Sequence, residues 1–236
     1  MDWKIIHIDE TDSTNRWLRQ SLNETQEQPV VVVADYQTAG RGCGTNSWES
    51  ERGKNLLFSM FYHPVGIPAI QQFRISMAIS LAISETLEQY IGDVSIKWPN
   101  DIYWRNGKIC GILIENVLQG SSIKNCIIGV GLNVNQQKFH SDAPNPVSLW
   151  QITRQDTDHD ALLEDILRRF EALIGQDVRH SYLLRLYRRK GFHPYVDAHG
   201  AFMAEIADVS DDGHLTLIDD TAKQRVYAFK EVSFVI

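Results

Sequence analysis

The sequence is poor in cysteine and has no apolar run long enough to cross a membrane. Its 236 residues include only Cys43, Cys110 and Cys126, which are odd in number, widely spaced and without C-x-x-C or paired-histidine patterns. This usage argues against a disulfide framework and against a zinc site. Because neither a run of about 18 apolar residues nor a secretory signal pattern occurs, we expect a cytoplasmic protein with no membrane partner.

Positive charge is also scarce. Lys and Arg total 23 against 30 Asp and Glu, which gives a net charge of −7. Such a balance offers no long-range attraction for polyanions, so we expect no nucleic-acid partner. The 43% hydrophobic content is enough for one substantial core and a small appended module, but the chain is short for two full domains.

The apolar pattern predicts strands mixed with helices. Strands are expected at residues 30–34, 56–62, 95–98, 102–104, 109–115 and 127–134. Two stripes at helical spacing predict helices with a buried face, formed by Ile70, Phe73, Met77 and Leu81, and by Leu162, Ile166, Phe170 and Leu173. A further helix is expected to run to Lys190, before Gly191. The dipeptide Asn106-Gly107 predicts a tight hairpin turn that mounts Lys108 rigidly at the start of a strand.

The pattern changes near the C-terminus. From Phe192 onward, short apolar segments are separated by Gly200, Asp212-Gly213 and Asp219-Asp220. This spacing is typical of a small β-barrel. We therefore expect two domains, residues 1–190 and residues 191–236.

Four short motifs of polar and glycine residues lie between these elements. They are Ser13-Thr14-Asn15, Tyr36-Gln37-Thr38-Ala39-Gly40-Arg41-Gly42, Lys97-Trp98-Pro99-Asn100-Asp101 with Lys108 and Gly111, and Gly129-Val130-Gly131-Leu132-Asn133. Ser13 alone could simply cap a short helix. Together, in this order and spacing, the motifs resemble the biotin–protein ligase family, and the resemblance covers nearly the whole chain.

The resemblance implies an α+β fold. Its parts would be a class II aminoacyl-tRNA-synthetase-like mixed β-sheet with flanking helices and a small C-terminal SH3-like β-barrel. The implied activity is ATP-dependent conversion of biotin to biotinoyl-5'-AMP, followed by transfer of biotin to one lysine of a biotin carboxyl carrier protein or carboxylase domain. ATP and Mg²⁺ would be required, and a homodimer is possible. Because Ser13 lies so near the start, we expect the monofunctional form without an N-terminal DNA-binding domain.

The resemblance also assigns roles to individual residues. Arg41 and Lys108 would be the catalytic cations, because joining a carboxylate to a phosphate brings two anions together. Biotin binding is assigned to Ser13, Thr14, Asn15, Gln37, Arg41, Gly42, Cys43, Lys108 and Gly111. ATP binding is assigned to Gly40, Arg41, Trp48, Lys97, Asn100, Asp101 and Asn133. Apolar walls for biotin are expected from Trp98, Ile112 and Leu113, and the metal ligands are unassigned.

The glycine-rich segment departs from the family pattern. Family members commonly read G-R-G-(R/Q)-(R/K)-G-(R/N)-x-W, whereas Cys43, Gly44 and Thr45 follow Gly42 here. Fewer donors would then hold the phosphate, so we expect faster loss of the adenylate. Cys43 invites a nucleophile interpretation, but no histidine lies nearby in the sequence to activate it.

Three alternatives remain open. A lipoate ligase or octanoyl transferase would share the fold but lack the G-R-G loop joined to K-W-P-N-D, and biotin-dependent pyrophosphate release would separate them. A regulator that binds biotinoyl-AMP and DNA would need a further N-terminal domain and a basic patch. A non-catalytic biotin-binding homologue is suggested by the altered loop, and transfer of labelled biotin to a carrier would decide against it.

Overall fold

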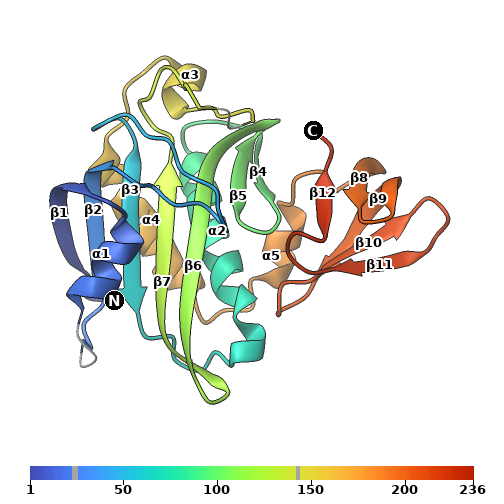
Figure 1. The fold of residues 1–236 in the computed structure, drawn as a ribbon, viewed down its shortest axis with the longest axis horizontal. Helices are drawn as coiled ribbons and strands as arrows, with labels where there is room; N and C mark the ends of the chain where they lie inside the picture. Colours follow the sequence, from blue (N-terminus) through green and yellow to red (C-terminus); the bar gives the residue numbers. More distant parts are fainter. Residues whose placement is uncertain (23–25, 142–143) are drawn as a thin grey trace.

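The computed structural model describes residues 1–22, 26–141 and 144–236, and a seven-stranded mixed sheet lies at its centre (Figure 1). The strand order is β1-β2-β3-β7-β6-β5-β4. The pair β1 and β2 is parallel, and the other neighbours are antiparallel. The strands are β1 (Lys4–Thr11), β2 (Val30–Gln37), β3 (Leu56–Tyr62), β4 (Val94–Lys97), β5 (Asp101–Trp104), β6 (Gly107–Gln119) and β7 (Ser122–Leu132). The sequence patterns had not predicted β1.

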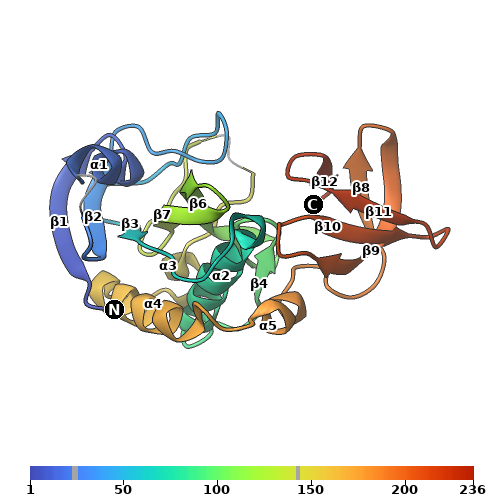
Figure 2. The same cartoon turned by 90° about the horizontal axis from the view of Figure 1, so that it is seen from below.

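Helices cover both faces of this sheet (Figure 2). Helices α2 (Phe73–Leu87) and α4 (His159–Leu173) lie on one face, and α1 (Thr14–Ser21) lies on the other. The shorter helices are η1 (Ala69–Gln71), α3 (Leu149–Thr153) and α5 (Arg179–Leu184). In the described part of the chain, no helix is both long and apolar enough to span a membrane.

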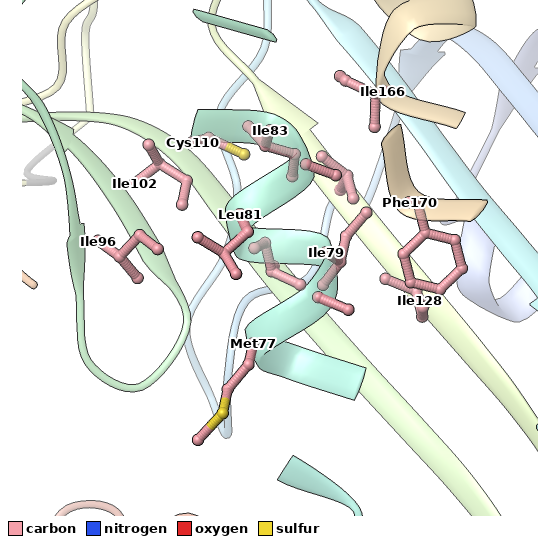
Figure 3. Close-up of a cluster of buried hydrophobic side chains, with 14 of the residues drawn as sticks. Met77, Ile79, Leu81, Ile83, Ile96, Ile102, Cys110, Ile128, Ile166 and Phe170 are labelled. Carbon is pink, nitrogen blue, oxygen red and sulfur yellow. The ribbon is translucent and has the colours of Figure 1, made fainter. Parts of the chain in front are cut away.

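The main core lies between the sheet and α2. Figure 3 shows Ile79 and Leu81 of α2 among side chains from the strands and from α4, including Ile128 and Phe170. Each of these four side chains is fully buried, and such burial stabilises the fold by about 1.5–3 kcal/mol per side chain. A smaller core lies under α1, where Leu18, Val30, Val32, Phe61 and Ile127 pack together.

A second sheet lies at the β4 side of the first (Figure 1). It is antiparallel, with the order β11-β10-β9-β8-β12. Its strands are β8 (His193–Asp197), β9 (Gly200–Val209), β10 (Leu215–Asp219), β11 (Gln224–Tyr227) and β12 (Val232–Phe234). Among the described residues, β11 and β12 do not pair, so the sheet is not closed. The structure therefore shows an α+β fold with two sheets, and the closed barrel expected from the sequence is not confirmed.

Two expectations about helices are wrong. The last helix ends at Leu184 rather than Lys190, because the chain then runs beside β4: the Ile96 N–H donates to the Arg185 carbonyl at 2.8 Å, and the Tyr187 N–H donates to the Ile96 carbonyl at 2.8 Å. Ile70 is not part of the core stripe. It lies in η1, before α2 begins, and 74% of its surface is exposed.

The predicted hairpin joins β5 to β6, but its turn lies one residue earlier than expected. Trp104 pairs with Gly107, so Arg105 and Asn106 form the turn. Arg105 has the positive φ, 50°, a conformation that non-glycine residues adopt infrequently. Lys108 is consequently the second residue of β6, held in the sheet as the sequence predicted.

Candidate active site

A pocket lies where the start of α1, the loop after β2 and strands β6 and β7 meet. Every residue assigned to biotin from the sequence lines it: Ser13, Thr14, Asn15, Gln37, Arg41, Gly42, Cys43, Lys108 and Gly111. The remaining lining residues are Trp48, Asn100, Ile112, Leu113, Gly129, Val130 and Gly131. Segments far apart in the sequence thus converge on one concave surface.

Ser13 begins the polar side of this pocket. It occupies the N-cap position of α1, but its side chain makes no capping hydrogen bond. Its backbone N–H instead donates to Asp12 Oδ1 at 2.6 Å, and only 3% of the residue is exposed. Helix capping therefore does not account for the Ser13 hydroxyl, which is left to face the pocket.

A hydrogen-bond network fixes the next two side chains. The backbone N–H and the hydroxyl of Thr14 both donate to Gln37 Oε1, at 2.8 Å and 3.1 Å. The Ser59 hydroxyl lies 2.7 Å from Thr14 Oγ1 and 2.6 Å from Asn15 Oδ1, and with a single hydrogen it donates to one of them. Because Ser59 is fully buried in β3, this network is rigid and shielded from water.

The Asn15 amide is held from several sides. Its Nδ2 donates to Glu115 Oε2 at 2.9 Å and to the Leu113 carbonyl at 3.4 Å. Gly129 of β7 lies directly beside it, and a β-carbon at Gly129 would be 2.9 Å from Asn15 Cγ, closer than such atoms can approach. The sheet therefore makes room for Asn15 by carrying glycine at this position.

Two cations, Lys108 and Arg41, line the pocket beside these polar side chains. Lys108 Nζ forms an ion pair with Asp101 Oδ1 at 2.7 Å and lies 5.5 Å from the centre of the Trp48 ring. Arg41 Nη1 lies 3.4 Å from Glu115 Oε1. Glu115 thus contacts both Arg41 and Asn15, and it also pairs with Arg19 at 3.0 Å.

The glycine-rich loop folds into a small hairpin that places Trp48. The Gly42 N–H donates to the Asn46 carbonyl at 2.7 Å, and the Trp48 N–H donates to the Gly40 carbonyl at 2.9 Å. The Trp48 indole rests on two glycines of the sheet: a β-carbon at Gly111 would lie 2.8 Å from its ring, and one at Gly131 would lie 2.5 Å from it. Close approach of the ring therefore requires glycine in β6 and β7.

A wider cleft of about 780 Å³ adjoins the pocket. Among its lining residues are five assigned to ATP from the sequence: Trp48, Lys97, Asn100, Asp101 and Asn133. Arg41 lines only the first pocket, and Gly40 lines neither. The two cavities share Gly42, Cys43, Trp48, Asn100 and Lys108, so a ligand could extend from one into the other.

Two buried polar atoms at this junction have no hydrogen-bond partner among the described residues, namely Trp48 Nε1 and Asn133 Oδ1. Asn133 Nδ2 is satisfied, since it donates to the Val147 carbonyl at 3.1 Å. Buried polar groups are normally hydrogen-bonded, and unpaired ones need an explanation. A ligand that offers both an acceptor and a donor would satisfy these two atoms.

Burial changes the acid–base behaviour of two residues. Burial lowers the pKa of Lys97, with Lys108 and Arg188 adding like-charge repulsion against the opposing effect of Asp101. Lys97 Nζ lies 5.4 Å from the Tyr103 ring centre and 5.0 Å from that of Phe234 in the second sheet. Burial, followed by the charge of Asp101, raises the pKa of the Cys43 thiol. A raised pKa disfavours the thiolate, which agrees with the interpretation that Cys43 is no nucleophile.

The structure adds residues that sequence reasoning did not single out. Ser59 interrupts the otherwise apolar strand β3, and Glu115 follows the apolar run Ile112–Leu113–Ile114, so each carried a weak signal. Phe229, in the turn between β11 and β12, lines the wider cleft, and nothing in the sequence pattern pointed to it. Trp98, an expected wall residue, lines neither cavity. It is buried in the main core and its Nε1 donates to the Gly213 carbonyl at 3.0 Å.

Comparison with known proteins places this site in a family context. The model of the biotin/lipoate A/B protein ligase family matches residues 8–133. The chain is 29% identical over 241 residues to the bifunctional ligase/repressor BirA of Bacillus subtilis, covering 97% of this chain and 73% of that protein. It is 32% identical over 180 residues to the biotin–[acetyl-CoA-carboxylase] ligase of Mycobacterium tuberculosis, covering 74% and 65%.

Solved structures show the same fold. The biotin protein ligase of Aquifex aeolicus, determined in complex with biotin and ATP, superposes with a TM-score of 0.77 at 24% identity. The superposition covers 97% of this chain and 97% of that one, so it includes both sheets. At this level of identity the likeness establishes the architecture and leaves the chemistry to the residues of the site.

Proposed function

Because the chain belongs to the biotin/lipoate A/B protein ligase family, we propose that it is an ATP-dependent biotin–protein ligase. It would convert biotin to biotinoyl-5'-AMP and pass the biotin to one lysine of a biotin carboxyl carrier protein or carboxylase domain. The observation that carries this proposal is the first pocket, where a neutral hydrogen-bonding set and two cations line one cavity.

The neutral set suits the ureido ring of biotin, which is uncharged and both donates and accepts hydrogen bonds. Ser13, Thr14, Asn15 and Gln37 carry hydroxyl and amide groups, and the network around Ser59 orients the last three before any ligand arrives. Ile112 and Leu113 offer apolar contact beside them. A few fixed polar groups among apolar walls are typical of small-molecule sites.

The two cations suit the first chemical step. In that step a carboxylate oxygen of biotin attacks the α-phosphorus of ATP, the bond to the β-phosphate oxygen breaks, and pyrophosphate leaves. Arg41 and Lys108 would offset the repulsion between carboxylate and phosphate and stabilise the charge that develops. Their present partners, Glu115 and Asp101, hold them at the pocket until the ligands compete for them.

In the second step this chain has only to hold the intermediate in the correct position, and no further reacting group is needed from it. The neutral amine of the carrier lysine attacks the carbonyl carbon of the mixed anhydride, AMP leaves with the electrons of the broken C–O bond, and the amine loses one proton to solvent as the amide forms. Holding the carboxyl and phosphate ends in fixed geometry supplies positional catalysis. The raised pKa of Cys43 is consistent with a route that has no covalent enzyme intermediate.

Nucleotide binding is assigned to the wider cleft. The unpaired Trp48 Nε1 and Asn133 Oδ1 support an adenine contact at the junction. Lys97, Asn100 and Asp101 of the cleft, with Arg41 of the adjoining first pocket, would lie around the phosphates and ribose. The first pocket encloses only about 40 Å³ while Trp48 covers Gly111 and Gly131. Since pockets for drug-sized ligands measure about 300–1,000 Å³, biotin would enter by displacing the Trp48 ring from Gly111 and Gly131.

Magnesium would bind mainly through ATP. In the described residues, no group of three His, Cys, Asp or Glu side chains could form a cage by itself. Mg²⁺ usually binds through one or two carboxylates together with substrate phosphates, and Asp101 in the cleft could supply one such carboxylate. Bound there, the ion would neutralise phosphate charge.

Several finer assignments belong to the same proposal. They are a class II aminoacyl-tRNA-synthetase-like first sheet, a C-terminal SH3-like barrel, a domain boundary between residues 190 and 191, a cytoplasmic location, a possible homodimer and no nucleic-acid partner. Support for the boundary comes from the sheets, since β8 at His193 starts a sheet that shares no strand with the first. A protease cut near residue 190 that releases a folded fragment would test it.

Substrate choice can be tested directly because the family name includes lipoate. The purified chain is mixed with ATP, Mg²⁺ and one acid at a time, and pyrophosphate release is measured with biotin, lipoate and octanoate. The proposal predicts release with biotin alone. Release with lipoate or octanoate but not biotin would instead assign the chain to lipoate or octanoyl chemistry. Biotin binding without any release would identify a non-catalytic homologue.

A further inference from the structure

The tip of the glycine-rich loop carries no basic side chain. Cys43 and Gly44 follow Gly42 there, and Gly44 has a φ of +71°. A side chain there would be strained, because L-residues rarely adopt this conformation. The tip of the loop itself therefore offers no cation to a phosphate.

The ammonium group of Lys230 lies beside Gly44. A β-carbon at Gly44 would overlap Lys230 Nζ and lie 3.5 Å from Lys230 Cε. Lys230 lies in the turn between β11 and β12, so its side chain crosses from the second sheet to the loop. The neighbouring Phe229 lines the wider cleft together with Cys43 and Lys108.

The turn holds this lysine in a defined position. The Ala228 N–H donates to Glu231 Oε2 at 2.7 Å, and the Glu231 N–H donates to the Ala228 carbonyl at 3.2 Å. Lys230 itself adopts a φ of 72°, which directs the chain sharply back into β12. Its ammonium lies 5.6 Å from the Phe229 ring centre, a favourable cation–π distance.

Lys230 also differs in its partners from Arg41 and Lys108, the two proposed catalytic cations. Lys108 is paired with Asp101 and Arg41 with Glu115. No carboxylate within residues 1–22, 26–141 and 144–236 forms an ion pair with Lys230. It can thus meet an anion without first breaking an ion pair with those residues. Its charge already acts on the Cys43 thiol, where it opposes the effect of burial on the pKa.

We infer that Lys230 binds the phosphate of biotinoyl-AMP and supplies from the C-terminal sheet the cation that the loop lacks at positions 43 and 44. This inference rests on the proposed function, because the ligand is the intermediate of that reaction. Gly44 is then the partner that makes room for the ammonium. The second sheet takes part in the site and slows loss of a reactive intermediate that water would otherwise hydrolyse.

The test measures retention of the intermediate. Labelled biotinoyl-AMP is formed on the full chain and chased with excess unlabelled biotin and ATP, and the first-order release rate is recorded. Lys230→Met should release it about tenfold faster or more, as expected for loss of one charge-assisted hydrogen bond. Lys230→Arg should stay near the parental rate. The matched control is Lys223→Met, an exposed lysine in the turn between β10 and β11, which should leave the rate unchanged.

A restoration variant separates a phosphate contact from a structural role. Adding Cys43→Arg to Lys230→Met should slow release again, because a loop cation returns to the same region. Added salt should speed release from the parental protein more than from Lys230→Met. Parental release rates in Lys230→Met, with normal adenylate formation, would overturn the inference and leave the ligase proposal standing. Failure of the parental protein to form any biotinoyl-AMP would instead overturn the proposed function.

Discussion

Gly129 of β7 and Asn15 of α1 are in direct contact: the glycine leaves the space that the asparagine amide fills. A β-carbon at Gly129 would overlap Asn15 Oδ1 and lie 2.9 Å from Asn15 Cγ. The amide cannot move away freely, because Glu115 and Ser59 hold it by hydrogen bonds. One side of the proposed biotin pocket therefore depends on the absence of a side chain in the sheet.

Replacing this glycine should weaken biotin binding. In Gly129→Ala the new methyl group displaces Asn15, and misplacement of a binding group by about 1 Å can cost on the order of 10²-fold. We expect the KM for biotin to rise at least about tenfold, with a smaller effect on the KM for ATP. Gly92→Ala is the matched control, since no atom lies within 4 Å of a β-carbon there. An unchanged KM for biotin in Gly129→Ala would remove Asn15 from the biotin site.

The buried hydroxyl of Ser59 should matter for the same substrate. Ser59→Ala removes the group that ties Thr14 to Asn15, and the loss of one such hydrogen bond costs about 1 kcal/mol. The KM for biotin should rise about fivefold in initial-rate measurements. Ser80→Ala is a suitable comparison because the Ser80 hydroxyl is also buried but has no partner among the described residues. Equal effects of the two substitutions would argue that Ser59 acts only through packing.

The catalytic cations give a third prediction. Arg41→Ala and Lys108→Ala should each slow biotinoyl-AMP formation by about 10²-fold, the usual effect of removing one preorganised electrostatic group. The unfolding midpoint should change little, since both side chains are partly exposed. Lys124→Ala, at an exposed position of β7, is the control. Adenylate formation at the parental rate in both variants would show that the cations are wrongly assigned.

Acid stability should depend on Asp219 in the second sheet. Hydrogen bonds from the Thr221 hydroxyl, the Lys223 N–H and the Arg225 side chain hold its pKa well below the usual value. Since the folded pKa lies below the unfolded value of about 3.9, the carboxylate stabilises the fold fully above that pH and loses this effect as pH falls toward the folded pKa.

Asp219→Asn should accordingly lower the free energy of unfolding most at neutral pH. Denaturant titrations should show the difference from the parental protein narrowing as pH falls below about 4. The exposed neighbour Asp220 offers the control Asp220→Asn. A difference that is constant with pH would mean that the Asp219 carboxylate is not selectively stabilised in its charged form.

The strands that frame the site were predictable because their apolar residues are local and dense. β3, β6 and the hairpin before Lys108 follow from short-range patterns. β1 was missed because Lys4–Thr11 mixes apolar and charged residues without strict alternation. It lies at a sheet edge and none of its residues is fully buried. The helix boundary at Leu184 was missed because a tertiary contact ends it, the pairing of the following residues with Ile96.

The residues of the site also fall into two groups, those that sequence motifs predict and those that only folding brings together. Residue types at the ends of elements, such as Gln37 and Lys108, could be chosen from the sequence motifs, and the structure places them in one pocket. The proposed role of Lys230 could not be predicted from the sequence. Lys230 lies 186 residues from Gly44 in the chain, and only folding brings the two residues together. Trp98 shows the opposite case: it belongs to a motif, yet it packs in the core.

Transfer of labelled biotin to a carrier tests the central claim most directly. The purified chain is incubated with ATP, Mg²⁺, labelled biotin and an apo biotin carboxyl carrier domain, beside a carrier whose acceptor lysine is replaced by arginine. The account predicts ATP-dependent label on the intact carrier, none on the lysine-free carrier, and strongly reduced label with Lys108→Ala. An intact carrier that stays unlabelled, while a known biotin–protein ligase labels it under the same conditions, would contradict the account.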